Sequence, residues 1–189
     1  MKVIIIEGTD NTGKNTLIQG LCELYNHVML IHCTTPPKEY TNTQKAMYQD
    51  ASFYSYANKL CSHFYDDVAD IVIFNRAWYG EYVYGTLYRN RTKESVKNML
   101  DTIETSLNEV NSLDVYYVQL VCDSTELLKK NDDGKSISNR IDNIIHETDL
   151  FVEAFSNSSL KKLLVKVNED DNFKDKNAIL NDVLKFIDD

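Results

Sequence analysis

The sequence contains no run of 18 or more apolar residues, and it has only two prolines and six glycines. Its apolar start, Val3 to Ile6, is too short for a membrane span or a secretory signal, and Glu7 follows it directly. We therefore expect no membrane partner and a cytoplasmic location. The prolines and glycines form no linker and there is no internal repeat, so residues 1–189 are predicted to form one domain.

Paired cysteines are also lacking. Cys22, Cys33, Cys61 and Cys122 are widely scattered, with no C-x-x-C pair, and the four histidines show no ligand spacing. In a cytoplasmic chain this pattern favours reduced, mostly buried thiols over a disulfide framework. It also argues against a structural metal, because none of the usual nitrogen and sulfur ligand clusters is present.

Basic residues are outnumbered: Lys and Arg total 20, Asp and Glu total 29, and the formal net charge is −9. A protein built to grip duplex DNA usually carries a basic face, because phosphate neutralisation drives that binding. The acidic total therefore disfavours nucleic acid as a partner, although it leaves room for a small local basic site. The apolar fraction of 43% is that of an ordinary soluble globular protein.

Five short runs rich in β-branched and aromatic residues predict strands, and they are near-continuously apolar, as in strands buried on both faces of a parallel sheet. Apolar stripes of helical spacing lie between and after them. The strand runs are Val3–Ile6, Val28–His32, Asp70–Phe74, Val115–Val121 and Leu163–Val167. The stripes are Leu17, Leu21, Leu24 and Tyr25, then Val96, Met99, Ile103, Leu107 and Val110, then Ile179, Val183, Phe186 and Ile187. This alternation predicts a three-layer α/β fold with a five-stranded parallel sheet flanked by helices.

The stretch GTDNTGKNT, residues 8–16, has a glycine, four spacer residues and then Gly-Lys, which is how a phosphate-binding loop begins. It stands where that motif requires, directly after a predicted strand and before a predicted helix. The glycines let backbone amides point inward, the helix adds the positive end of its dipole, and Lys14 supplies a mobile cation for the β- and γ-phosphates. The residues predicted to bind the phosphates of ATP are Gly8, Asn11, Thr12, Gly13, Lys14, Asn15 and Thr16.

One position of this loop departs from the usual pattern. A hydroxyl residue normally follows the lysine and ligates Mg²⁺, whereas this chain has Asn15. The Asn15 amide oxygen can ligate Mg²⁺ from a longer, branched side chain, and the Thr16 hydroxyl is better placed for an α-phosphate. We expect Mg-ATP to bind with weakened or more water-mediated metal contacts. Asn15 and Asp10 are the candidate metal ligands.

Two segments carry a family resemblance. Ile6-Glu7-Gly8-Thr9-Asp10, leading into Gly13-Lys14, is similar to the E-G-x-D-x-x-G-K start of the thymidylate kinase-like group of P-loop kinases. Phe74-Asn75-Arg76-Ala77-Trp78-Tyr79-Gly80 resembles the D-R-S or D-R-Y segment at the end of that group's third strand, and the run from Glu81 to Arg89 resembles small phage-encoded members. The resemblance implies a P-loop NTPase fold, ATP and Mg²⁺, a nucleotide or nucleoside acceptor and, by analogy, a homodimer. For a phage-encoded chain the location would be the host cytoplasm.

By this resemblance Arg76 binds the phosphate or 5′ end of the acceptor, since a guanidinium at the carboxyl edge of a strand can clamp an anion. The family has a carboxylate at the preceding position. This chain has Asn75 there, which can hydrogen-bond a hydroxyl but brings no negative charge to Mg²⁺. Asp10 matches the family's loop aspartate and is then the remaining carboxylate predicted beside the transferring phosphoryl group. The alternatives are a surface ion pair for Arg76 and a loop-capping role for Asp10.

Kinases of this group carry a lid after the fourth strand, and the lid brings Lys or Arg to the transition state. The corresponding region here is 129–145, with Lys129, Lys130, Lys135 and Arg140. An isolated charged loop is usually just solvated, so the alternative for each of these residues is a solvent-exposed charge with no catalytic role. Arg140 is favoured, because a guanidinium fork can bridge phosphate oxygens.

The base pocket is predicted from an aromatic-rich helical stretch between the second and third strands. In the family the corresponding helix provides a ring that stacks on a pyrimidine, and core packing is the alternative for each aromatic residue. Tyr54 from this stretch and Glu81 from the run after the third strand join Asn75 and Arg76 as candidate acceptor-binding residues.

These features predict an ATP-dependent kinase that moves the γ-phosphoryl group to a deoxynucleoside monophosphate or a deoxynucleoside with a pyrimidine base. The predicted catalytic residues are Asp10, Lys14, Arg76 and Arg140. Two alternatives stay open. One is a kinase acting on a modified base or terminus in DNA. The other is a nucleotide-binding protein with impaired catalysis, for which neutral amides at positions 15 and 75 are the expected signature.

Overall fold

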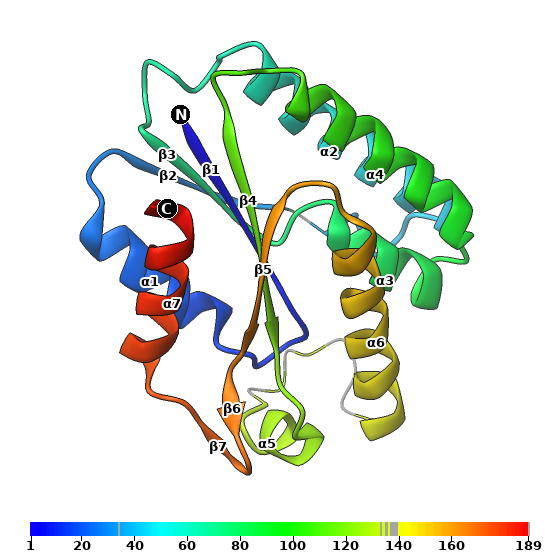
Figure 1. Ribbon diagram of the computed structural model, residues 1–189. Coiled ribbons are helices and arrows are strands. Elements are labelled where there is room, and N and C mark those ends of the chain that lie inside the picture. Colours follow the sequence, from blue (N-terminus) through cyan, green and yellow to red (C-terminus); the bar gives the residue numbers. More distant parts are fainter. Residues whose placement is uncertain (34, 133, 135, 137–139, 189) are drawn as a thin grey trace.

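Five parallel strands form one sheet in the order β2–β3–β1–β4–β5 through the centre of the molecule (Figure 1). The computed structural model describes residues 1–33, 35–132, 134, 136 and 140–188. A short antiparallel hairpin of β6 and β7 follows the last strand of the sheet. The strands are β1 (Lys2–Glu7), β2 (Val28–His32), β3 (Ile71–Asn75), β4 (Asp114–Val121), β5 (Lys161–Lys166), β6 (Asn168–Glu169) and β7 (Asn172–Phe173).

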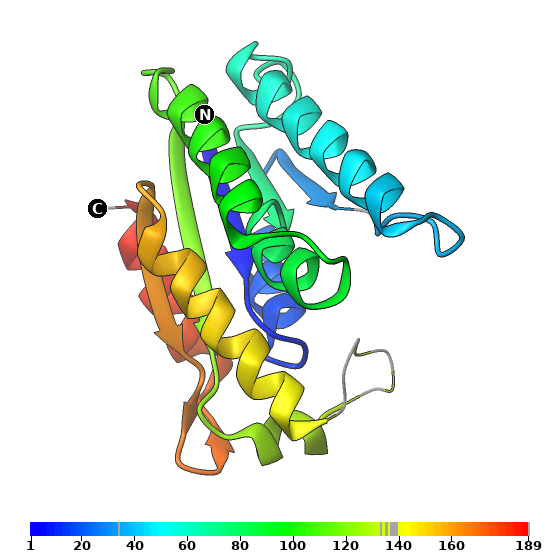
Figure 2. The same ribbon diagram turned by 90° about the vertical axis from the view of Figure 1, so that its right-hand side faces the viewer.

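Helices cover both faces of this sheet. α1 and α7 lie on one face, and α2, α3, α4 and α6 lie on the other, as Figures 1 and 2 show from two directions. The helices are α1 (Lys14–Leu24), α2 (Asn42–Cys61), α3 (Tyr79–Tyr88), α4 (Lys93–Asn108), α5 (Thr125–Lys130), α6 (Ile141–Asn157) and α7 (Lys176–Asp188). The predicted three-layer α/β fold with a five-stranded parallel sheet is thus confirmed.

Local sequence signals set the start of two long helices. Thr41 precedes α2, and its side-chain oxygen accepts from the backbone N–H of Gln44, whose side chain in turn accepts from the Thr41 N–H. The hydroxyl of Thr92 accepts from the backbone N–H of Ser95 at the start of α4. These bonds satisfy amides that have no partner within the helix, which is why Thr is favoured at such positions.

The central strand β1 explains why its sequence is continuously apolar. Val3 and Ile5 face the core under α2, α3, α4 and α6, whereas Ile4 and Ile6 face the core under α1 and α7. All four side chains are fully buried. Successive side chains of a strand point to opposite faces, so a strand covered on both sides needs an apolar residue at every position.

The register of the sheet brings two loops together. Ile6 of β1 lies opposite Asn75 of β3, and Glu7 lies opposite Gln119 of β4. Because the strands are parallel, their carboxyl ends meet at the same edge of the sheet. The loop that follows β1 and the turn that follows β3 therefore begin side by side.

The predicted strands agree with the structure to within two residues at each end, but uniform two-sided burial is wrong for the edge strands. Leu30 of β2 is 38% exposed and Leu164 of β5 is 41% exposed. The helical layers cover the middle of the sheet, so the outer strands lie at the rim of that cover. The β6–β7 hairpin was not predicted, because its two-residue strands carry no periodic signal.

The predicted apolar stripes coincide with helices, but two of them continue beyond the buried part of the helix or beyond its end. Leu17 and Leu21 of α1 are buried, but Leu24 is 56% exposed in the last turn, and Tyr25 follows the helix. Val110 likewise lies beyond the end of α4. Apolar spacing does not report where a helix stops, because the chain can continue the same period after the last helical hydrogen bond.

Hydroxyl–carboxylate hydrogen bonds join α3 to α6. The Tyr82 hydroxyl donates to Glu153 over 2.7 Å, and the Tyr88 hydroxyl donates to Glu147 over 2.6 Å. Trp78, the single tryptophan of the chain, is fully buried at the start of α3. The turn after β3 is therefore held from within the core and from the neighbouring helix.

None of the helices in the described part of the chain is long and apolar enough to cross a membrane. The four cysteines are free thiols. Cys122 is buried, and Cys22, Cys33 and Cys61 are partly buried against the core, so the expected burial is complete only for Cys122.

We predict that Leu21→Ala lowers the free energy of unfolding by about 2–5 kcal/mol, because it opens a cavity between α1 and the sheet. Leu24→Ala removes the same atoms from an exposed position of the same helix and should change stability by no more than about 0.5 kcal/mol. Urea unfolding followed by far-UV circular dichroism measures both. Equal losses in the two variants would contradict the packing described for α1.

Candidate functional site

The loop between β1 and α1 has the backbone shape that its sequence predicts. Asn11 has a φ of 65° and Gly13 a φ of 86°, so both adopt the left-handed conformation, and Gly8 has a φ of 147°. Gly13 directly precedes α1, and no side chain among the described residues caps that helix. The first amides of α1 are thus open to an anion, which the helix dipole favours.

Gly8 is required by the close approach of a neighbouring strand. A Cβ built on Gly8 would lie 2.6 Å from the backbone oxygen of Leu120 in β4. Real Cβ atoms essentially never come so close to a backbone atom, so any side chain at position 8 would displace the loop or the strand. The hydroxyl of Thr12 closes the loop from inside by donating to the Thr9 carbonyl over 2.9 Å.

Lys14 is buried in the loop, with 8% of its surface exposed. Its ammonium group donates to the carbonyls of Gly8 and Thr9 over 3.0 and 2.7 Å. Burial lowers the pKa of Lys14 well below its ordinary value, and the nearby Arg76 charge acts in the same direction. An anion in the loop would favour the charged form of this lysine and so bind more strongly to it.

Arg76 lies in the turn after β3 with a left-handed backbone, at a φ of 62°. Its guanidinium donates to the Gly8 carbonyl over 2.9 Å and forms an ion pair with Asp10. The rings of Tyr84 and Phe151 lie 5.2 and 6.0 Å from the guanidinium carbon. The two predicted catalytic residues Asp10 and Arg76 are therefore in direct contact, between the loop and the helices α3 and α6.

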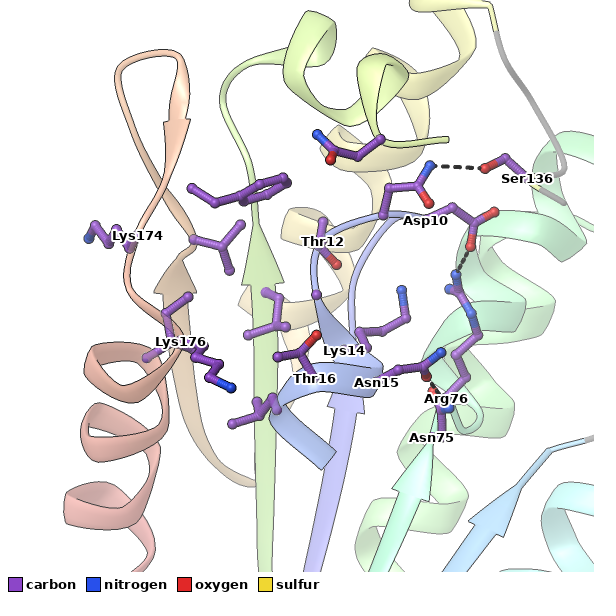
Figure 3. A pocket seen from close by; sticks show the side chains of 18 residues that line it. Asp10, Thr12, Lys14, Asn15, Thr16, Asn75, Arg76, Ser136, Lys174 and Lys176 are labelled. Carbon is purple, nitrogen blue, oxygen red and sulfur yellow. Dashed lines mark hydrogen bonds and ion pairs between the residues drawn. The ribbon is translucent and has the colours of Figure 1, made fainter. Parts of the chain in front are cut away.

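The two amides that depart from the family pattern are bonded to each other. The Asn75 side-chain N–H donates to Oδ1 of Asn15 over 2.9 Å (Figure 3). The same nitrogen lies 3.1 Å from Nδ1 of His32. His32 ends β2, Asn75 ends β3 and Asn15 lies in the first turn of α1. The oxygen of Asn15 that could ligate a metal is thus held by a neutral donor.

The predicted lid is only partly described. Lys129 and Lys130 are the last two residues of α5. Arg140 is exposed and directly precedes α6, which contains residues 141–145 of the predicted lid. Ser136 accepts a hydrogen bond of 3.2 Å from the Asn11 side chain, which links this segment to the loop. Lys135 lies outside the described residues, and the catalytic role of Arg140 stays a prediction.

A cavity of about 590 Å³ opens beside the loop. It brings together all but one of the predicted phosphate-binding residues with Asp10, Asn75 and Arg76. Lys174 and Lys176 lie on the side of the loop away from Asn75 and Arg76 (Figure 3). The lining residues that the sequence did not indicate are Leu17, Leu120, Asn131, Ser136, Val167, Phe173, Lys174, Lys176 and Ile179.

Four predicted residues lie elsewhere. Gly8, Tyr54, Glu81 and Arg140 are not among the described residues that line this cavity. Gly8 forms the base of the loop, and Tyr54 is 37% exposed on α2. Glu81 is buried in ion pairs with Arg89 and Arg91, so its partners are cations of its own chain. Binding of an acceptor by Tyr54 and Glu81 stays a prediction.

A second carboxylate near Asp10 was missed in the sequence. Glu147 of α6 is 2% exposed and accepts from Tyr88. Burial raises the pKa of the Glu147 carboxyl, and Asp10 acts in the same direction while Tyr88 opposes it. Nothing in the sequence around position 147 marks it as different from other acidic residues of an amphipathic helix.

The residues present fit a nucleotide phosphate better than they fit a metal. The inward lysine, the left-handed glycine and the uncapped start of α1 form a cradle for an anion. The oxygens available to Mg²⁺ are the amide of Asn15 and the carboxylate of Asp10, and both have protein partners. Mg²⁺ prefers hard oxygen ligands, so it would have to compete with Asn75 and Arg76 for these two side chains.

Comparison with known proteins identifies the fold. No family model and no curated protein sequence matches the chain. The thymidylate kinase of Candida albicans aligns with a TM-score of 0.69 at 16% identity, covering 98% of this chain and 90% of that one. The thymidylate kinase of Ehrlichia chaffeensis aligns at 0.64 and 16% identity, covering 97% of each chain. The YorR protein of Bacillus subtilis, solved in complex with phosphorylated GDP, aligns at 0.64 and 19% identity, covering 98% and 95%. The chain has the P-loop kinase fold of the thymidylate kinases.

We predict that the two glycines of the loop differ in their tolerance of alanine. Gly13→Ala meets no atom of a described residue within 4 Å and carries the left-handed strain, roughly 1–2 kcal/mol. Gly8→Ala adds the clash with Leu120 and should cost more. Denaturant unfolding of both variants measures the difference, and a Gly8→Ala protein as stable as Gly13→Ala would contradict the close approach.

Proposed function

We propose that this protein is an ATP-dependent kinase that transfers the γ-phosphoryl group to a deoxynucleoside monophosphate or deoxynucleoside with a pyrimidine base. One observation carries the proposal. The loop after β1 and the turn after β3 present Lys14, Asp10 and Arg76 to the same cavity. A lysine in a phosphate-binding loop and an arginine at the next strand end are the cations that hold the two reactants of phosphoryl transfer.

The donor nucleotide would occupy the part of the cavity between the loop and the β6–β7 hairpin. Its phosphates would lie on the loop, with Lys14 exchanging the Gly8 and Thr9 carbonyls for phosphate oxygens. Phe173 supplies apolar surface on which a base can pack, and Lys174 and Lys176 add positive charge. This size and lining are typical of small-ligand sites, with apolar walls and a few placed polar groups.

The acceptor would bind at Arg76. Its guanidinium is paired with Asp10, so an incoming phosphate or hydroxyl would share the arginine or take the place of the carboxylate. Asp10 would then lie between acceptor and donor, where a carboxylate can accept a hydrogen bond from an attacking hydroxyl. Transfer of this kind depends mainly on positioning and charge stabilisation, so few groups need to act directly.

Mg²⁺ bound to the donor would neutralise charge on the β- and γ-phosphate oxygens. Asn15 is the residue best placed to hold it directly, with Asp10 as the nearest carboxylate of the loop. Asn75 holds the Asn15 oxygen through a 2.9 Å hydrogen bond, with which metal binding has to compete. We therefore expect a high Mg²⁺ requirement.

A second candidate is a nucleotide-binding protein with impaired catalysis. The bond between Asn15 and Asn75 favours it, because both positions that normally bring oxygen ligands or charge to the metal are neutral amides bonded to each other. Incubation with labelled ATP and a panel of nucleosides, monophosphates and oligonucleotides decides between the two. Transfer to a small acceptor supports the kinase, and binding without turnover supports the second candidate. Transfer only to oligonucleotides would contradict both.

Lys14→Ala should lower kcat/KM by about 10²–10³, the usual loss for one group that stabilises transition-state charge. Lys93→Ala removes a lysine that pairs with Glu153 on the surface and should leave the rate unchanged. Initial rates measured over a range of ATP concentrations at saturating acceptor give kcat/KM for both variants, and circular dichroism confirms that they are folded. A wild-type rate in Lys14→Ala would refute the assignment of the loop.

The pair of substitutions Asn15→Ser and Asn75→Asp should lower the Mg²⁺ concentration for half-maximal activity by roughly tenfold or more, within the range seen when groups around a metal are changed. The change supplies a hydroxyl and a carboxylate and removes the amide–amide bond. Mg²⁺ titrations of the single and double variants measure it. An unaltered Mg²⁺ dependence in the double variant would show that these positions do not handle the metal.

A further inference from the structure

Glu7 is a buried carboxylate that has no part in the mechanism above. It is the last residue of β1, directly before the phosphate-binding loop, and its side chain is fully buried. A charge so deeply buried is costly unless it is paired and hydrogen-bonded. Its partners therefore indicate what the carboxylate does.

Both hydrogen bonds of Glu7 go to the turn that carries Arg76. Oε1 accepts from the backbone N–H of Ala77 over 2.7 Å and from the N–H of Gly80 over 3.2 Å. Gly80 is in the first turn of α3, where Trp78 at the N-cap position makes no side-chain bond. Glu7 thus caps α3 from a neighbouring strand and holds the residue next to Arg76.

The remaining oxygen of Glu7 makes no hydrogen bond to any described residue of the chain, and it is buried. The charge is instead compensated at longer range by two cations of the site, Arg76 and Lys14, which lower the pKa of Glu7. The other titratable groups that face Glu7 are Cys33 after β2, Tyr84 of α3 and Tyr117 of β4. Burial raises the pKa of each of these three, so they are neutral near pH 7.

We propose that Glu7 is a positioning residue for the acceptor site: its carboxylate fixes the turn that presents Arg76, so acceptor binding depends on the ionisation of a group that does not touch the acceptor. This inference rests on the proposed function, because it takes Arg76 as the acceptor-binding residue. It goes further by naming the group that controls that arginine.

A pH dependence follows from this arrangement. Burial raises the pKa of Glu7 to about 7, although Arg76 and the two backbone donors oppose the shift. Above that pH the carboxylate is charged and holds both amides. As the pH falls below about 7 it takes up a proton, and the turn loses its charged acceptor. The KM for the acceptor should therefore rise as the pH falls, and by more than the KM for ATP, because the hydrogen bonds of Glu7 go to the turn of Arg76 and not to Lys14.

Glu7→Gln separates charge from shape, since the amide oxygen can still accept both N–H groups. At pH 8 we expect an acceptor KM roughly fivefold or more above that of the wild type, the lower end of couplings between sites. The difference should shrink toward pH 6, because the wild type loses the same charge. An acceptor phosphate titrates near pH 6 in both proteins, so the comparison between them cancels its effect.

Glu104→Gln is the matched control. Glu104 is also a buried carboxylate and accepts from the Tyr79 hydroxyl over 2.7 Å and the Ser159 N–H over 2.6 Å, but among the described residues it bonds neither to the loop nor to the backbone amides of the Arg76 turn. Its substitution should lower stability without moving the acceptor KM. Equal effects of Glu7→Gln and Glu104→Gln on that KM would overturn the positioning role.

A measurement without turnover keeps this inference distinct from the proposed function. In the ¹⁵N-labelled wild-type protein, the Nε–H signal of Arg76 should shift with a midpoint near pH 7, and Glu7→Gln should abolish that step. If no acceptor is phosphorylated and the step is present, the proposed function fails, but the hold of Glu7 on the turn that presents Arg76 stands. If the wild-type signal shows no step near pH 7, the inference is wrong whatever the enzyme does.

Discussion

The parallel pairing of β1 with β3 is the constraint on which the site depends. It places the carboxyl ends of the two strands side by side, with Ile6 opposite Asn75. The Arg76 N–H then donates to the Ile6 carbonyl over 3.1 Å, and its guanidinium reaches the Gly8 carbonyl and Asp10. A phosphate-binding loop and an arginine that are nearly 70 residues apart in the chain thereby share one cavity. Without this register the loop would be an anion cradle with no second reactant beside it.

The polar groups of the site satisfy one another. Lys14 donates to carbonyls of its own loop, Arg76 pairs with Asp10, and the Asn15 amide accepts from Asn75. Buried polar groups need such partners, because leaving one unsatisfied costs about 1–3 kcal/mol. A nucleotide has to replace these internal bonds with bonds of its own. Affinity at this site is therefore the difference between two sets of hydrogen bonds, and small changes at positions 15 and 75 can shift it in either direction.

Much of this architecture could be predicted from the sequence, because it rests on local signals. The apolar strand runs and the Gly-Lys loop required no knowledge of distant contacts. The hydrogen bond between Asn15 and Asn75 could not be predicted, since the two residues meet only through the order of the strands. Glu7 was given no role for the same reason: in the sequence it follows an apolar run and opens the family's loop pattern, but its two amide partners follow another strand. Phe173 lines the cavity from the β6–β7 hairpin, and the strands of this hairpin are too short to leave a periodic pattern in the sequence.

The position of Trp78 gives the protein an optical reporter of its own. It is the only tryptophan of the chain, it is fully buried, and its ring lies 5.6 Å from Phe74. It stands two residues after Arg76, between the two amides that Glu7 holds. Indole emission depends on the polarity and packing around the ring. In the folded protein, all tryptophan fluorescence therefore arises at the turn that presents Arg76. A change in that turn can be followed by intrinsic fluorescence, without an added label.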